Sequence, residues 1–162
     1  MRTFLESIQY SAFGLWVAGG DTIFAYPTIL ALHTLGLGIV VGMSAIINCH
    51  VLFGMGRGVA LGNFAWLFRI LWIGLALNGT TGVILFIAAA ADKAYQEIFY
   101  LKLVFIALAL VAVIRIRRSI FLAPAAIEGT MPRHARVLAA LSLVLWMGAI
   151  VAGRLMAYTT TF

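Results

Sequence analysis

Four apolar segments constrain the fold of this chain more than any other feature. They cover approximately residues 26–53, 64–91, 98–118 and 135–158. Each is long enough to cross a bilayer, because a helix of ~20 residues spans ~30 Å of hydrocarbon. The segments are continuously apolar rather than alternating, which indicates helices and not the strands of a closed barrel. The sequence therefore predicts an all-α fold: an integral membrane four-helix bundle that forms a single domain over residues 1–162.

Little of the chain remains outside these segments. Hydrophobic residues make up 64% of it and charged residues only 10%, with a mean hydropathy of +1.10, whereas about a quarter of a soluble domain is charged. The connections are too short to hold a soluble catalytic domain. The net charge of +6 does not indicate nucleic-acid binding, because the arginines lie in loops beside the apolar segments, as the positive-inside rule expects.

Residues 3–18 are expected to form an amphipathic helix that lies along the bilayer surface. Apolar residues such as Phe4, Ile8 and Leu15 recur at helical spacing, and Glu6 and Gln9 lie on the opposite side. A signal peptide is the competing interpretation. Glu6 places a negative charge near the start of the segment, where a signal peptide is positively charged. In addition, no small-x-small cleavage site follows an apolar core, so the interfacial helix is preferred.

The distribution of charge predicts the orientation. The loops between the first and second segments and between the third and fourth hold seven of the eleven basic residues, while the opposite side holds four basic residues with four of the five acids. The positive-inside rule then places both termini outside. The seven are Arg57, Arg69, Arg115, Arg117, Arg118, Arg133 and Arg136.

Three histidines and one arginine inside or beside the apolar segments are the candidate functional residues. Polar side chains are costly in hydrocarbon, so each of these four residues is expected to have a partner or a ligand. His50 and His134 are expected at the same depth near the inner face, where two imidazoles could ligate one b-type haem. His33 could ligate a second haem near the outer face, with Arg154 neutralising a propionate. The sequence therefore predicts one or two haem b groups.

Other interpretations stay open. His134 could contact lipid headgroups and His50 a neighbouring carbonyl, and Asn78 is expected to bond another helix. A copper-handling protein would use Met43, Cys49, His50 and Met55, although these positions fall on different helix faces. A cofactor-free accessory subunit would pack through small residues such as Gly38-x-x-x-Gly42, within a homo-oligomer or a larger membrane complex.

Several motifs resemble a large uncharacterised family of bacterial four-helix inner-membrane proteins. They are Tyr26-Pro27, Leu32-His33-Thr34-Leu35-Gly36, Leu101-Lys102-Leu103 and Trp146-x-Gly148 through Gly153-Arg154. That family is similar in layout to the copper-resistance D and cytochrome b561-like membrane proteins. The resemblance implies a multi-pass protein of the bacterial inner membrane with both termini in the periplasm. It also implies haem b and electron transfer to or from quinone or a partner complex, as a subunit rather than a stand-alone enzyme. The chain departs from the family at Arg115-Ile116-Arg117, where relatives often carry a histidine.

Overall fold

The computed structural model describes residues 2–20, 22–53, 65–118 and 133–158 and is helical almost throughout. Four long helices match the four predicted segments: α3 (Tyr26–Phe53), α4 (Ala65–Ala88), α6 (Glu97–Ile116) and α7 (Arg133–Tyr158). Each is long and apolar enough to cross a membrane. The prediction of an all-α four-helix bundle is confirmed, and the chain is a multi-pass membrane protein.

The long helices form two pairs. α3 packs along α4, α6 packs along α7, and contacts between α3 and α7 join the pairs. α4 ends earlier than expected, at Ala88, because Ala89 leaves the helical conformation, and the short helix α5 (Ala90–Lys93) follows. We call the end of the bundle near α5 the α5 end. The opposite end is the arginine end, defined by the exposed residues Arg69, Arg115, Arg117, Arg118, Arg133 and Arg136.

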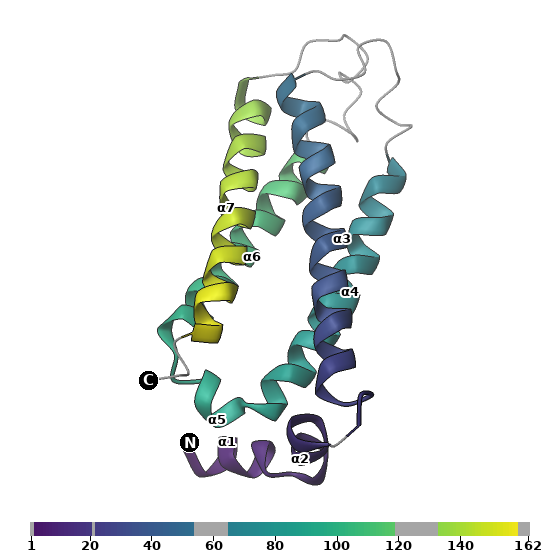
Figure 1. Cartoon of the computed structure of the whole chain (residues 1–162). Coiled ribbons are helices and arrows are strands. Elements are labelled where there is room, and N and C mark those ends of the chain that lie inside the picture. The colour runs from purple at the N-terminus through teal and green to yellow at the C-terminus, as the bar shows by residue number, and fades with distance from the viewer. Residues whose placement is uncertain (1, 21, 54–64, 119–132, 159–162) are drawn as a thin grey trace.

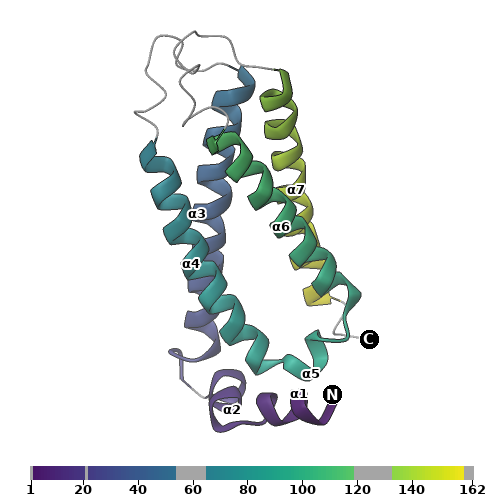
Figure 2. The same cartoon turned by 180° about the vertical axis from the view of Figure 1, so that it is seen from behind.

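The pairs are held together mainly toward the arginine end. A core of buried residues from all four long helices lies there, including Ile47, Leu71, Val113 and Ala139. At the α5 end the corresponding core contains only residues of α2, α3 and α4. In both views the two pairs lie closest at the arginine end and diverge toward the α5 end (Figures 1 and 2).

The N-terminal segment forms two helices instead of the single one expected over residues 3–18. α1 (Arg2–Gln9) and α2 (Ala12–Gly19) lie across the α5 end of the bundle (Figure 1). Ser11 caps α2, because its hydroxyl accepts a hydrogen bond from the Gly14 N–H at 3.1 Å and donates one to the Ile8 carbonyl at 2.7 Å. A Cβ on Gly14 would collide with the carbonyl oxygens of Gln9 and Ile8, so the turn requires glycine.

Glycines also set the closest approaches between the long helices. A Cβ on Gly36 of α3 would lie 2.8 Å from the backbone nitrogen of Asn78 on α4, and one on Gly74 would lie 2.9 Å from the Ile39 Cβ. Gly38 and Gly42, in the predicted packing motif, have nothing within 4 Å of a Cβ position. The α3–α4 crossing therefore uses Gly36 and Gly74 and leaves the Gly38-x-x-x-Gly42 face open.

Candidate functional site

His33 lies about two turns inside α3 from the α5 end, half-buried against α4. Its Nδ1 is 3.0 Å from the carbonyl oxygen of Asn78 and 3.1 Å from the hydroxyl of Thr81. The Asn78 amide donates in return to the His33 carbonyl at 2.8 Å. The expectation that Asn78 bonds another helix is confirmed, and the histidine is tied to α4 by both its ring and its backbone.

These partners assign the tautomer of the His33 ring. A carbonyl oxygen only accepts hydrogen bonds, so a lone pair on Nδ1 would face the lone pairs of Asn78 at 3.0 Å. The Asn78 side-chain amide also lies 3.4 Å from Nδ1, but it donates over a shorter distance, 2.8 Å, to the His33 carbonyl. The shorter contacts thus favour the tautomer with the proton on Nδ1. The Thr81 hydroxyl can receive it, since its own hydrogen is directed to the Leu77 carbonyl at 2.7 Å. Nε2 keeps its lone pair, and no hydrogen bond joins it to the residues that the structure describes.

Small residues make room for this arrangement. A Cβ on Gly82 would lie 3.1 Å from the His33 Cε1, which is tighter than an ordinary contact. The close approach of the backbones at Gly36 brings Asn78 within reach of α3. Two glycines on facing helices thus allow the imidazole to lie between α3 and α4 without a clash.

Two lysines lie at the same end of the bundle as His33. Lys102 on α6 is half-buried with its Nζ 3.7 Å from a Cβ position on Gly153. Its charge acts on His33, and the charge of Lys93 acts on Lys102. The Lys93 ammonium donates to the Gln96 side chain and to the Met156 carbonyl, both at 3.4 Å. Burial lowers the pKa of Lys93, and the Asp92 carboxylate opposes that shift.

The other predicted site residues lie elsewhere. His50 is buried at the arginine end of α3, and His134 is exposed in the first turn of α7. Asn48 donates to Ser142 at 3.0 Å, which sets the register of these antiparallel helices. His50 lies two residues beyond Asn48 toward the arginine end, whereas His134 lies eight residues beyond Ser142 in that direction. The two histidines therefore differ in depth by about 9 Å, instead of sharing one level.

Arg154 is exposed near the end of α7, and its guanidinium carbon lies 5.9 Å from the centre of the Tyr158 ring. This cation–π contact involves a residue of its own helix. The cation whose charge acts on His33 is instead Lys102.

Of the residues considered for copper, Met43, Cys49 and His50 lie on α3. Met43 packs against the core at the arginine end, and Cys49 is a half-buried free thiol. Met55 lies outside the described residues. Within the described ranges, no group of three or more His, Cys, Asp or Glu side chains is arranged to hold a metal ion.

A second polar cluster is buried between α3 and α7. The Asn48 amide donates to the Ser44 and Ser142 hydroxyls at 3.2 and 3.0 Å, and all three side chains are fully buried. The Asn48 Oδ1 and the Trp146 Nε1 are buried, and neither has a hydrogen-bond partner within the described part of the chain. Hydrogen bonds between small polar side chains commonly join membrane helices, so this cluster serves the packing of α3 on α7.

Sequence reasoning missed three participants of the His33 site or its surroundings. The sequence does not distinguish Thr81 from any other threonine in an apolar segment, so its role could not be predicted. Lys102 did give a signal, because an isolated cation at the fifth residue of an apolar segment is costly and calls for an explanation. Lys93 follows two residues after the end of the second apolar segment, where a charged residue is ordinary. No family model matches the chain, and neither a curated protein nor a solved structure is detectably similar to it.

Proposed function

We propose that this chain is a membrane-embedded b-type haem protein that transfers electrons, with His33 as an axial ligand. The observation that carries the proposal is the Nδ1–H of His33 bonded to the Asn78 carbonyl. Histidines that ligate metals commonly donate their other ring N–H to a carbonyl, which fixes the tautomer and raises the basicity of the ligating nitrogen. Nε2 of His33 has the lone pair that haem iron requires.

The surrounding residues fit the same group. A haem b needs apolar walls for its porphyrin and cations for its propionates. The two helix pairs diverge toward the α5 end, on which side His33 lies (Figures 1 and 2). Lys102 supplies positive charge that acts on His33, and the charge of Lys93 acts on Lys102. In this proposal they replace Arg154 as the partners of the propionates.

Each residue has a separate role. The Asn78 carbonyl and the Thr81 hydroxyl orient the imidazole, and Gly82 leaves space for it. Lys102 would stabilise the extra negative charge of the reduced state. When bound, a haem b supplies one-electron oxidation and reduction. The electron donor or acceptor would be a quinone or a partner complex in the bilayer, and the chain is an electron-transfer subunit rather than an enzyme on its own.

The proposal is limited to one haem. A second haem at the arginine end would need His50 and His134 on either side of one iron, and the register of α3 and α7 separates them by about 9 Å in depth. His50 is also about 25 Å along α3 from His33, so it does not supply the second axial ligand of the His33 haem.

One observation favours a second candidate function, that of a cofactor-free subunit of a larger membrane assembly. Gly38, Gly42 and Gly79 have nothing within 4 Å of their Cβ positions. Small residues that are free of contacts in the chain leave α3 and α4 able to accept a helix from another subunit or a second copy.

We also propose that the arginine end faces the cytoplasm of a bacterial cell, so that both termini lie in the periplasm. Six arginines are exposed at that end, while Asp92, Lys93 and Glu97 gather at the other. Cysteine-accessibility labelling tests this: a cysteine placed at exposed Tyr95 should react with an impermeant reagent in intact cells, and one at exposed Arg136 should not. The reverse pattern would overturn the orientation.

The haem proposal is tested with the full chain purified in mild detergent. We expect b-type bands in a reduced-minus-oxidised spectrum and about one extracted haem per chain. His33→Ala should abolish the bands, while the matched control His134→Ala, at an exposed residue, should leave them unchanged. Thr81→Val should keep the haem but shift its midpoint potential, because one acceptor of the Nδ1 proton is lost.

Two outcomes decide between the candidates. A colourless wild-type chain, or a His33→Ala variant with the full haem signal, would overturn the haem proposal. A colourless chain that purifies as an oligomer would support the accessory function. In that case Gly38→Leu on the open glycine face should weaken association, whereas Ala107→Leu, at an exposed small residue of α6, should not.

A further inference from the structure

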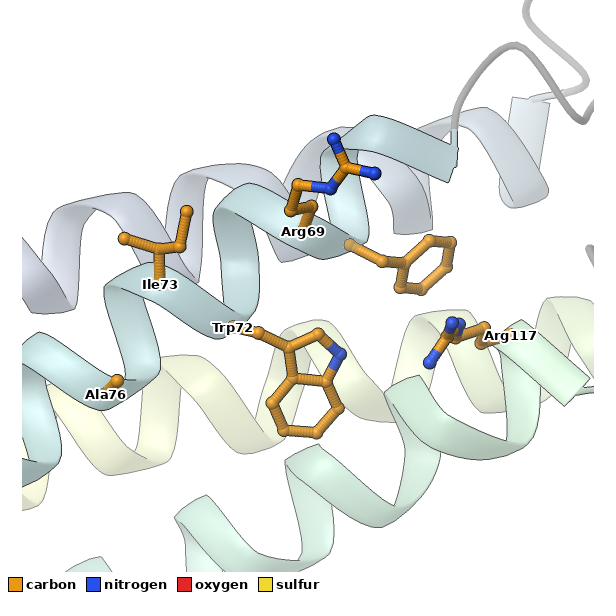
Figure 3. A pocket seen from close by; sticks show the side chains of 6 residues that line it. Arg69, Trp72, Ile73, Ala76 and Arg117 are labelled. Carbon is orange, nitrogen blue, oxygen red and sulfur yellow. The ribbon is translucent and has the colours of Figure 1, made fainter.

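A groove of about 540 Å³ lies between α4 and the end of α6, away from His33. Its lining consists of Phe68, Arg69, Trp72, Ile73, Ala76 and Arg117. Figure 3 shows Arg69 on α4 and Arg117 on α6 near one end of the lining, with Trp72, Ile73 and Ala76 following along α4. The groove is therefore cationic at one end and apolar along the rest.

The α4 residues form one continuous stripe. Positions 69, 72, 73 and 76 have the spacing of neighbours on one helix face, and the stripe extends about 10 Å from the arginine end toward the centre of the bundle. Trp72 is 38% exposed and Ile73 61% exposed. α4 and α6 make few contacts with each other here, since the helix pairs are joined mainly through α3 and α7. The stripe thus faces the bilayer.

Among the residues that the structure describes, neither of the two guanidinium groups has an acidic partner. The ion pair found in the described residues joins Arg2 to Glu6 in α1, and the described acids Glu6, Asp92 and Glu97 all belong to the α5 end. The Arg117 guanidinium carbon lies 5.7 Å from the centre of the buried Phe68 ring. This cation–π contact orients the planar group while leaving its N–H donors available.

We propose that this groove binds one anionic phospholipid of the leaflet at the arginine end. Arg69 and Arg117 hold the phosphate, since a guanidinium matches phosphate geometry with paired hydrogen bonds. The first part of an acyl chain lies along Trp72, Ile73 and Ala76. A free phosphate ion would use the arginines but would leave the apolar stripe without a role. The stripe and the two cations together select a lipid with a net negative headgroup over a zwitterionic one.

The test uses the full chain in mild detergent, with bound lipid counted by native mass spectrometry. Phosphatidylglycerol and phosphatidylcholine with the same acyl chains are added in turn. We expect one retained phosphatidylglycerol and an apparent affinity about tenfold above that for phosphatidylcholine. Arg69→Gln/Arg117→Gln should remove this preference. The matched control Arg133→Gln/Arg136→Gln removes the same charge from exposed positions at the same end and should keep it.

Each alternative outcome overturns the proposal. Equal retention of the two lipids would show that charge does not select the ligand, and loss of phosphatidylglycerol in the control variant would show a diffuse surface effect. Competition by inorganic phosphate at millimolar concentration would show a phosphate-ion site. Binding of a second protein chain that excludes lipid would show a protein interface. If the double variant does not fold, Trp72→Ala tests the apolar part alone and should lower lipid retention without changing the preference for the anionic headgroup.

Discussion

The α3–α4 crossing leads to the sharpest stability prediction. Gly36→Ala places a methyl group 2.8 Å from the Asn78 nitrogen and 3.0 Å from its Cα. Both are backbone atoms, which cannot move aside as the end of a flexible side chain can. The two helices must therefore separate locally, and the hydrogen bonds between His33 and Asn78 lengthen.

The magnitude follows from two contributions. Overpacking a close contact costs about 1–3 kcal/mol. The His33–Asn78 pair contributes two interhelical hydrogen bonds, at 2.8 and 3.0 Å, and such bonds in membrane proteins average about 0.6 kcal/mol each. Gly36→Ala should accordingly lower the free energy of unfolding by about 2–4 kcal/mol. Alanine's better helix propensity offsets up to about 1 kcal/mol of this.

Gly38→Ala is the matched control, because it lies two residues away on the same helix with nothing within 4 Å of its Cβ position. It should be neutral or stabilising by up to about 1 kcal/mol. Unfolding in mixed micelles, followed by circular dichroism, measures both variants. Equal effects of the two substitutions, or a larger loss for Gly38→Ala, would refute the crossing point at Gly36.

Three further predictions concern separate parts of the molecule. Gly14→Ala should disrupt the turn between α1 and α2 and raise hydrogen exchange of the α1 amides, because its Cβ would meet carbonyl oxygens there; unchanged exchange would contradict the turn. Lys102→Met should lower the midpoint potential of the proposed haem in a redox titration, since a nearby cation favours the reduced state. A larger shift from Arg154→Gln would instead assign the propionate to Arg154. A double-mutant cycle of Asn48→Ala and Ser142→Ala should give a coupling of about 0.6 kcal/mol in unfolding experiments, and additive effects would argue against their hydrogen bond.

The length and continuity of the apolar segments determined the helices. Hydrophobic continuity over about 20 residues leaves a membrane helix as the only satisfactory use of the backbone hydrogen bonds, and α3 begins and ends at the predicted residues. The residues that form the break between α1 and α2, Ser11 and Gly14, are also visible in the sequence. The apolar periodicity that runs through residues 3–18 nevertheless favoured one continuous helix in the sequence analysis.

Only the tertiary structure decided which faces of the helices meet. α3 and α4 are apolar on all sides, so neither has an amphipathic stripe that would identify its packed face from the sequence. The sequence therefore offered Gly38-x-x-x-Gly42 as a contact face without showing whether its partner lies in the same chain, and it favoured one depth for His50 and His134. The structure uses Gly36, and the Asn48–Ser142 bond sets a register that separates the two histidines. His33 was singled out correctly as a buried polar residue, but its partners Asn78 and Thr81 come from a helix more than 40 residues away, a proximity that depends on how the two helices cross.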